Sequence, residues 1–249
     1  MTVVLLIKQL LENPGHFNLI DKLDWYFLPV LNPDGYVQSN EDRCWRKSKS
    51  CFNDCPTGIK CTGVDLNRNW GHMWNQGDKG DHCNNGHGNY SGPEPFSEIE
   101  TQNVRDFILA HNDKIKFFNT LHSYGQFIIL PWSYTNAVKP PSYKRIEKLA
   151  KKGNAALRKV HDTVYEIGTA EETIGYTASG VSTDWALDEA KIPYVMCMEL
   201  PPRCEWNDIF CKYLGGGFLL PWERIEPTAE EVWAFHEEVA KELIAEFVP

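Results

Sequence analysis

The chain has 249 residues, and 25 Lys and Arg against 34 Asp and Glu give it a formal net charge of −9. Hydrophobic residues make up 42% and charged residues 24%, which excludes disordered, collagen-like and fibrous classes and predicts one globular domain with a sizeable core. The acidic balance argues against nucleic acid and anionic membrane surfaces as partners. The longest apolar run near either end, residues 3–7, is far below the roughly 20 residues that span a bilayer. We therefore expect no membrane helix, and no signal peptide within this chain.

In the first half, apolar residues at helical spacing predict a helix over residues 3–11, ended by Asn13-Pro14-Gly15. The dense apolar run 25–31 predicts a strand, closed by a turn at Asn32-Pro33-Asp34-Gly35. Residues 47–96 are rich in Gly, Asn, Asp, Ser and Cys, which is typical of a long functional loop region.

The second half predicts alternating helices and strands. A capping box at Ser97-Glu98-Ile99-Glu100 predicts a helix that reaches about His111, and a second box at residues 227–231 predicts the last helix. A basic amphipathic helix should run from Pro140 to about His161, with its lysines forming a solvated face rather than a binding patch. Strands are predicted over 117–121, 127–130 and 192–200. This alternation predicts an α/β fold whose largely parallel or mixed sheet is covered by helices on both faces.

The eight cysteines divide into two groups. Cys44, beside Trp45, and Cys197, within an apolar run, are expected to be buried free thiols. The others lie in or beside polar stretches, which is typical of disulfides in a secreted protein, and we expect an extracellular parent protein whose N-terminus lies outside this chain. The second group consists of Cys51, Cys55, Cys61, Cys83, Cys204 and Cys211.

Polar side chains follow the predicted strands, where ligand crevices of open α/β sheets lie. Glu199 is the one charge in the strand 192–200, so it either faces a cleft or pairs with an arginine. His122 follows the strand 117–121, and a histidine in such a place is more often a hydrogen-bonded core residue than a metal ligand. Asn67 and Arg68 could bind a carboxylate as a fork, or Arg68 could be an ordinary surface arginine. The residues alone predict an enzyme-like α/β domain and leave these alternatives open.

Eight blocks follow one another over nearly the whole chain, at residues 31–36, 44–47, 63–70, 121–124, 176–180, 184–185, 199–200 and 217–221. In this order they resemble the zinc metallocarboxypeptidases of the carboxypeptidase A/B type. The resemblance implies a mixed eight-stranded-type sheet with helices on both faces, lacking the first strand or strands, in a single catalytic domain over 1–249 that is N-terminally incomplete. It also implies a monomer that acts on the C-termini of peptides and proteins.

The resemblance also implies catalytic roles. His122 matches the third zinc ligand, and Glu199 matches the general base that activates the zinc-bound water. Arg46 matches the cation that stabilises the oxyanion. Asn67 and Arg68 match the pair that binds the terminal carboxylate of the substrate.

Further residues are assigned to substrate binding and to disulfides by the same resemblance. Tyr176 matches a mobile tyrosine that closes over the bound C-terminus, and Tyr124 matches a residue of the neighbouring subsite. Thr183 occupies the position that sets specificity, and with Val181 and Cys197 nearby it suggests a preference for apolar or aromatic C-terminal residues. The implied disulfides are Cys61 with Cys83, Cys204 with Cys211 and Cys51 with Cys55.

The sequence departs from this family at the zinc site. The family's first two ligands form a His-x-x-Glu motif, but none of the eight histidines here has Asp or Glu three residues before or after it. His82, Cys83 and His87 are conceivable substitutes, although the cysteine fits a disulfide better. With one ligand of three, zinc should bind weakly or not at all. The chain is therefore either an N-terminally incomplete secreted zinc carboxypeptidase, which we favour, or a non-catalytic module that binds peptide C-termini.

Overall fold

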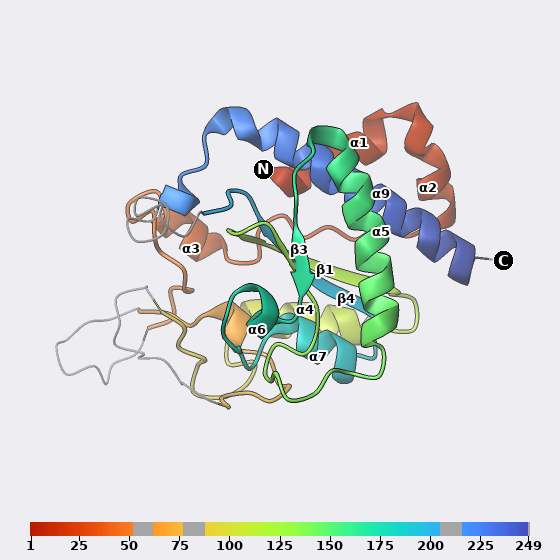
Figure 1. Cartoon of the computed structure of the whole chain (residues 1–249). Coiled ribbons are helices and arrows are strands. Elements are labelled where there is room, and N and C mark those ends of the chain that lie inside the picture. Colours follow the sequence, from red (N-terminus) through yellow and green to blue (C-terminus); the bar gives the residue numbers. More distant parts are fainter. Residues whose placement is uncertain (52–61, 77–87, 205–215, 249) are drawn as a thin grey trace.

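The computed structural model describes residues 1–51, 62–76, 88–204 and 216–248, which form a mixed sheet packed between helices (Figure 1). The longer helices are α1 (Thr2–Glu12), α4 (Ile99–His111), α5 (Tyr143–His161) and α9 (Ile225–Phe247). The shorter ones are α2 (Phe17–Lys22), α3 (Pro33–Gln38), α6 (Ala170–Thr173) and α7 (Ser182–Asp188). Short 3₁₀ turns are η1 (Pro14–His16), η2 (Leu66–Arg68), η3 (Gly216–Phe218) and η4 (Trp222–Arg224).

Within the described residues the sheet has four strands in the order β1-β4-β2-β3. The strands are β1 (Phe117–Ser123), β2 (Phe127–Ile129), β3 (Glu166–Gly168) and β4 (Tyr194–Leu200). β1 pairs with β4 and β2 with β3 in parallel, whereas β2 and β4 are antiparallel, so the sheet is mixed as expected. The described residues therefore contain four strands of the eight-stranded sheet that the resemblance implied.

Helices cover both faces of the sheet, as predicted. Because successive side chains of a strand point to opposite faces, β4 contributes to two cores. Met196 and Met198 pack in the larger cluster with α1, α5 and α9, and Val195 packs in the smaller cluster with α4 and α7. The helices α5 and α9 pack very closely, since a Cβ added to Gly153 would lie 2.6 Å from the ring of Phe235. The strands are thus fixed from both sides, which holds their carboxyl ends in place.

The predicted strand 25–31 is extended but is not part of a sheet. Its side chains alternate, with Trp25 and Phe27 packed against the core and Tyr26 and Leu28 exposed. Among the described residues, no partner strand bonds to it. The apolar run correctly predicted an extended conformation, but strand pairing depends on a neighbour that the run itself cannot reveal.

Both predicted capping boxes are wrong, although both helices exist. α4 begins one residue later than expected, with Glu98 at its N-cap, and the hydroxyl of Ser97 donates to Glu98 Oε1 at 2.9 Å instead of capping the helix. α9 begins at Ile225, so Thr228 lies within the helix and is buried rather than capping it. For Ser97 the bond to Glu98 decided the outcome, whereas the hydroxyl of Thr228 has no hydrogen-bond partner among the described residues.

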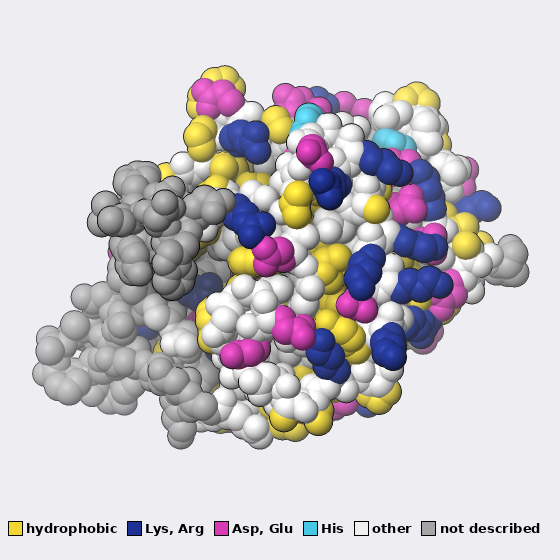
Figure 2. All heavy atoms as spheres, viewed as in Figure 1, with side chains coloured by type: hydrophobic (Ala, Val, Ile, Leu, Met, Phe, Trp, Pro, Cys, Tyr) yellow, Lys and Arg dark blue, Asp and Glu magenta, His cyan; other side chains and the backbone are white. Residues whose placement is uncertain are grey.

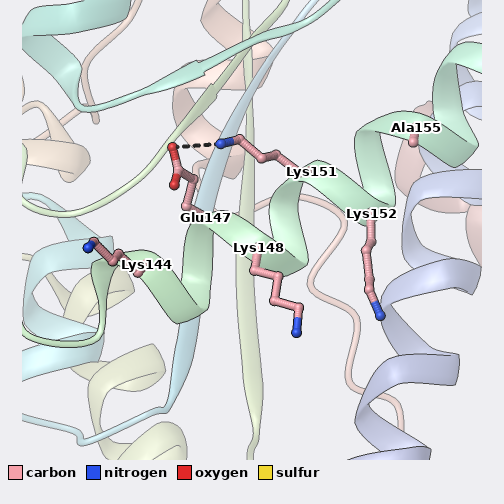
Figure 3. Close-up of a pocket in the computed structure, with 6 residues that line it drawn as sticks. All are labelled: Lys144, Glu147, Lys148, Lys151, Lys152 and Ala155. Atoms are coloured by element: carbon pink, nitrogen blue, oxygen red, sulfur yellow. Dashed lines mark ion pairs between the residues drawn. The ribbon is translucent and has the colours of Figure 1, made fainter.

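The basic face of α5 is solvated, as predicted. A shallow hollow on it is lined mainly by lysines, whose side chains extend in different directions (Figure 3). Lys151 pairs with Glu147 at 3.0 Å and Lys152 with Glu242 at 2.5 Å, so part of this positive charge is already neutralised. Figure 2 shows acidic side chains interspersed among these cations.

The cysteines agree only in part with the sequence analysis. Cys197 is a buried free thiol, as expected, but Cys44 is free and exposed, so the prediction that it is buried is wrong. Cys44 lies in the irregular stretch that follows α3 and is exposed there. Cys51 and Cys204 are disulfide-bonded. Their expected partners Cys55 and Cys211, the expected pair Cys61 and Cys83, and the candidate ligands His82 and His87 lie outside the described residues.

No helix in the described parts of the chain is both long and apolar enough to span a bilayer.

Candidate active site

The candidate site forms at the carboxyl ends of β1 and β4. These strands are parallel, and His122 and Glu199 are partners in their register. Paired residues of neighbouring strands point to the same face of a sheet, so both side chains project toward the α7 side, together with Cys197. The two polar groups that the sequence analysis placed at separate strand ends are therefore brought together.

Asn67 connects His122 to α7. Its Nδ2 lies 3.2 Å from Nε2 of His122, and its Oδ1 accepts from the backbone N–H of Ser182 at 3.0 Å. Burial, with Arg46 and Arg68 nearby, lowers the pKa of His122 to about 4, so the ring is neutral at pH 7 and Nε2 can accept from the Asn67 amide. His122 is thus held in one orientation by a neighbour 55 residues away in the sequence.

Asp65 holds Arg46 and Asn67 in place through its two carboxylate oxygens. Its Oδ1 accepts from the backbone N–H of Asn67 at 3.0 Å, which caps η2, and its Oδ2 accepts from Nε of Arg46 at 2.7 Å. Burial raises the pKa of Asp65, but the charges of Arg46 and Arg68 outweigh burial and hold the pKa below its usual value. One buried carboxylate therefore fixes both the guanidinium of Arg46 and the start of the Asn67–Arg68 pair.

The pKa of Glu199 is shifted in the opposite direction from that of Asp65. Burial raises its pKa to about 7, against the opposing effect of Arg46 and Arg68. Within the described parts of the chain, no cation lies within ion-pair distance of its carboxylate, so the alternative of a direct structural ion pair is not observed. A carboxylate in this setting can both accept and return a proton near neutral pH.

Arg68 is anchored through its backbone. Gly180 has φ +64°, and a Cβ added there would lie 2.3 Å from the carbonyl oxygen of Arg68. The carbonyl of Gly180 accepts from the N–H of Trp70 at 3.0 Å, which ties this loop to the Asn67–Arg68 segment. Only glycine allows such a close approach in this backbone conformation. The guanidinium of Arg68 also donates from Nη1 to the carbonyl of Asn67 at 2.8 Å.

The two tyrosines lie on different elements. Tyr176 is 52% exposed, in the loop that leads to Gly180, and is close enough to Arg46 to affect its pKa. Tyr124 directly follows β1 and packs edge-on against Phe218 at 4.8 Å, with its ring against Gly217. Tyr176 therefore lies near Arg46, whereas the ring of Tyr124 lies against η3.

Thr183 is buried in α7, with Val181 and Cys197 also buried. In the described structure, no hydrogen bond links the Thr183 side chain to the other candidate residues. Its assignment to a specificity pocket stays a prediction.

Two site-supporting residues were quoted in the sequence blocks without a role. One is Asp65, described above. The other is Asp184, whose carboxylate is fully buried and accepts from the backbone N–H groups of Ser133, at 2.9 and 3.0 Å, and Tyr134, at 3.0 Å. The available signal was an aspartate with an apolar residue directly beside it, because a carboxylate that is buried with such a neighbour must find donors.

The described residues do not fit a catalytic zinc site. Nowhere among them do three His, Cys, Asp or Glu side chains come close enough to hold a metal ion. His122 offers one neutral imidazole nitrogen, and that nitrogen faces the Asn67 amide. Catalytic zinc is held by three protein ligands, so His122 alone does not make such a site.

Comparisons with known proteins agree with this architecture. Residues 1–235 match the model of the zinc carboxypeptidase family. The chain is 37% identical over 235 residues to carboxypeptidase B of Astacus astacus, covering 93% of this chain and 72% of that protein. It is 40% identical over 223 residues to carboxypeptidase A2 of Rattus norvegicus, covering 89% of this chain but only 48% of the relative, so it spans about half of that protein's length.

Solved structures show the same fold. The carboxypeptidase A structure from Helicoverpa armigera superposes with a TM-score of 0.84 at 29% identity, covering 100% of this chain and 58% of that one. Bovine thrombin-activatable fibrinolysis inhibitor, solved in complex with tick carboxypeptidase inhibitor, superposes with a TM-score of 0.83 at 28% identity, covering 98% and 77%. The arrangement of strands and site residues and the match over residues 1–235 lead to one conclusion: the chain belongs to the zinc carboxypeptidase family.

Proposed function

We propose that the protein removes the C-terminal residue of peptides and proteins as a metallocarboxypeptidase. One observation carries the proposal: the Asn67 side chain joins His122 to α7, which puts the Asn67–Arg68 pair beside Glu199 at the carboxyl ends of β1 and β4. Membership of the family supports the same activity.

Each site residue has a chemical task in this reaction. The guanidinium of Arg68, with the amide of Asn67, binds the terminal carboxylate through parallel hydrogen bonds, which restricts cleavage to the last peptide bond. The carboxylate of Glu199 takes a proton from the attacking water and delivers it to the leaving amine as the C–N bond breaks. Arg46, held by Asp65, stabilises the negative charge that develops on the carbonyl oxygen.

The substrate is expected to end in an apolar or aromatic residue. Thr183, Val181 and Cys197 are all uncharged and buried near this end of the sheet. An uncharged pocket cannot compensate the desolvation of a lysine or glutamate side chain. Release of the last residue from peptides ending in Phe, Leu, Lys and Glu measures this preference, and faster release of Lys than of Phe would contradict it.

The disulfide-bonded Cys51 and Cys204 support an extracellular location for the protein, since such bonds persist in oxidising compartments. We expect it to act as a monomer.

A second candidate is recognition of peptide C-termini without cleavage. It is favoured by the ligand set, because the described residues supply a single imidazole where catalytic zinc requires three ligands. The two candidates share the carboxylate-binding pair and differ in the chemical step, so one experiment separates them.

The test uses two peptides of the sequence benzoyl-Gly-Phe, one with a free and one with an amidated C-terminus. Calorimetry measures binding, and chromatography measures release of Phe with zinc added. Arg68→Met should weaken binding of the free acid at least tenfold, about 1.4 kcal/mol, and leave the amide unaffected. Arg158→Met is the matched control, because Arg158 is exposed on α5 and pairs only with Asp162 within the described structure.

The outcomes are distinct. Preferential binding of the free acid with release of Phe supports the carboxypeptidase. Preferential binding without release supports the non-catalytic module. Equal binding of acid and amide would contradict both.

A further inference from the structure

Residues 89–91 have the sequence Asn-Tyr-Ser, a motif to which neither the fold nor the candidate site gives a role. Asparagine followed two residues later by Ser or Thr, with any residue except proline between them, is the acceptor of N-linked oligosaccharides. No other asparagine of the chain is followed in this way. A motif of three residues also arises by chance, so its surroundings in the structure decide whether it can be used.

Asn89 lies in an irregular part of the chain and its amide is open to solvent. Residues 88–98 form neither helix nor strand. Within the described residues, the half-buried Asn89 side chain makes no hydrogen bond, and its amide atoms are not among the buried polar atoms that lack a partner. A polar atom that is neither bonded nor buried contacts water. The amide nitrogen is therefore accessible, as an acceptor of a bulky group must be.

The backbone after Asn89 is held in place by other groups. The carbonyl of Tyr90 accepts from the N–H of Asp65 at 2.8 Å. The carbonyl of Ser91 accepts from Nδ2 of Asn69 at 2.9 Å. These bonds tie the motif to the segment that carries the candidate site, and none of them uses the side chain of Asn89. A group attached to the Asn89 amide thus leaves these contacts intact.

The disulfides indicate the compartment in which such a group is attached. Cys51 and Cys204 are disulfide-bonded. Disulfides form and persist in the oxidising lumen of the endoplasmic reticulum and outside the cell. N-linked oligosaccharides are transferred to proteins in the same lumen, so a chain that acquires these disulfides there also meets the transferring enzyme.

We propose that Asn89 is an N-glycosylation site. In the transfer, Nδ2 of Asn89 forms a bond to the anomeric carbon of an oligosaccharide carried on a polyprenyl diphosphate. The bond from that carbon to the diphosphate oxygen breaks, the polyprenyl diphosphate leaves, and a base of the transferring enzyme takes one amide proton. Nothing is oxidised or reduced. The site rests on the extracellular location proposed above and not on the catalytic activity of the chain.

The attached oligosaccharide is placed close to the candidate site. Asn89 directly precedes Tyr90, which bonds to Asp65, and Asp65 in turn holds Arg46. An oligosaccharide is bulky and hydrated, so it covers part of the surface beside this segment and adds to its solubility.

Production in a eukaryotic secretory pathway tests the proposal. Residues 1–249 are joined to a cleavable secretion leader and produced in mammalian cells, and the chain is collected from the cells and the medium together. Peptide N-glycosidase in water enriched in heavy oxygen converts a glycosylated asparagine into a labelled aspartate, which mass spectrometry locates. Label at position 89 in most molecules is the expected result. Peptide cleavage is not measured, so a chain without carboxypeptidase activity can still show the label.

Variants of the motif make the result specific. Asn89→Gln removes the acceptor amide and should abolish the label. Ser91→Ala removes the hydroxyl that the transferring enzyme recognises and should lower the labelled fraction at least tenfold. Ser91→Thr keeps a hydroxyl and is the matched control, with a labelled fraction at least equal to that of the original chain. The transfer takes place as the chain enters the lumen, so these results do not depend on how the variants fold.

Asn136 supplies a positive control in the same chain. It is exposed and is followed by Ala137 and Val138, so it lacks the motif. Val138→Ser completes the motif at this exposed position, and label at Asn136 in that variant shows that the chain has reached the transferring enzyme. Label at Asn136 with none at Asn89 would overturn the proposal. Label at Asn89 that persists undiminished in Ser91→Ala would also overturn it, because it would come from a reaction that ignores the motif.

Discussion

Asn67 and Asp65 show how few residues define the candidate site. Asn67 contacts the ring of His122 with its amide nitrogen and the start of α7 with its amide oxygen. Asp65 holds Arg46 through one oxygen and the backbone of Asn67 through the other. The positions of the Arg46 guanidinium, the His122 imidazole and the Asn67 amide are therefore coupled. A substitution of Asn67 or Asp65 should displace all three groups.

Gly180 offers a test of that coupling through the backbone. Gly180→Ala should destabilise the chain by about 2–4 kcal/mol, because the methyl group would lie 2.3 Å from the carbonyl of Arg68 at a positive φ. Gly175→Ala is the matched control, since φ is +80° there but nothing lies within 4 Å. It should cost only about 1 kcal/mol of conformational strain. Urea unfolding measures both, and equal costs would contradict a close contact at Gly180.

At the residue scale, part of the site could be predicted. His122 and Glu199 follow from polar groups at the ends of apolar runs, and their register confirms that they lie side by side. The ion pair between Arg46 and Asp65 could not be predicted, because it joins two irregular segments whose approach depends on the whole fold.

At the scale of elements, the start of α7 is held by a buried charge. Asp184 accepts backbone hydrogen bonds from Ser133 and Tyr134, and the carbonyl of Ser133 in turn accepts from the N–H of Ala178 at 2.7 Å. The loop that carries Tyr176 is thereby tied to the segment after β2. Asp184 orders this region together with the bonds of Ser182 to Asn67 and of Trp70 to Gly180.

Asp184 should make stability depend on pH. Burial raises its pKa to about 7 in the folded chain, against 3.8 for an unperturbed carboxyl, although the N–H groups of Ser133 and Tyr134 oppose the shift. Between these values the folded state binds more protons than the unfolded state, so the free energy of unfolding falls as pH rises through this window. The effect is about 1.4 kcal/mol per pH unit at most.

Asp184→Asn isolates this contribution, because asparagine keeps one acceptor oxygen and does not titrate. Urea unfolding at pH 4, 5, 6 and 7 should show the original chain losing stability relative to the variant as pH rises. A difference that stays constant from pH 4 to 7 would show that Asp184 does not titrate in this range.

The helices were more predictable than their ends. The spacing of apolar residues located α1 and α5, because each buries one face against the sheet or another helix, whereas α4 and α9 were predicted from capping boxes. The capping boxes failed because Ser97 and Thr228 found other environments, one bonding to Glu98 and the other buried within α9. Local motifs compete with tertiary contacts that the sequence does not display.

At the scale of the whole molecule, the ligand set predicts weak metal binding. After dialysis, the chain should retain less than one zinc ion per molecule, because no three-ligand group exists among the described residues. His122→Asn should leave the zinc content unchanged. Elemental analysis measures both, and tight one-to-one zinc that is lost in the variant would contradict the expectation.

The fold class was predictable because alternating helical and strand patterns leave few arrangements. The mixed sheet and the helices on both faces follow from it and are confirmed. Residues 24–31 make no backbone hydrogen bond within the described part of the chain, and this was not predictable, since an apolar run specifies burial and not the identity of a neighbour.

The anchoring of the loop that carries Tyr176 determines which kind of motion can bring this side chain over a bound ligand. Ala178 is bonded to Ser133 and Gly180 to Trp70, so the backbone is fixed within two residues of the tyrosine. Tyr176 itself is 52% exposed and free to turn about its own side-chain bonds. Rotation of an exposed side chain takes picoseconds to nanoseconds, whereas hinged loops need microseconds or longer. Any closure by Tyr176 is therefore a fast local step, and it cannot be the slow step of a catalytic cycle.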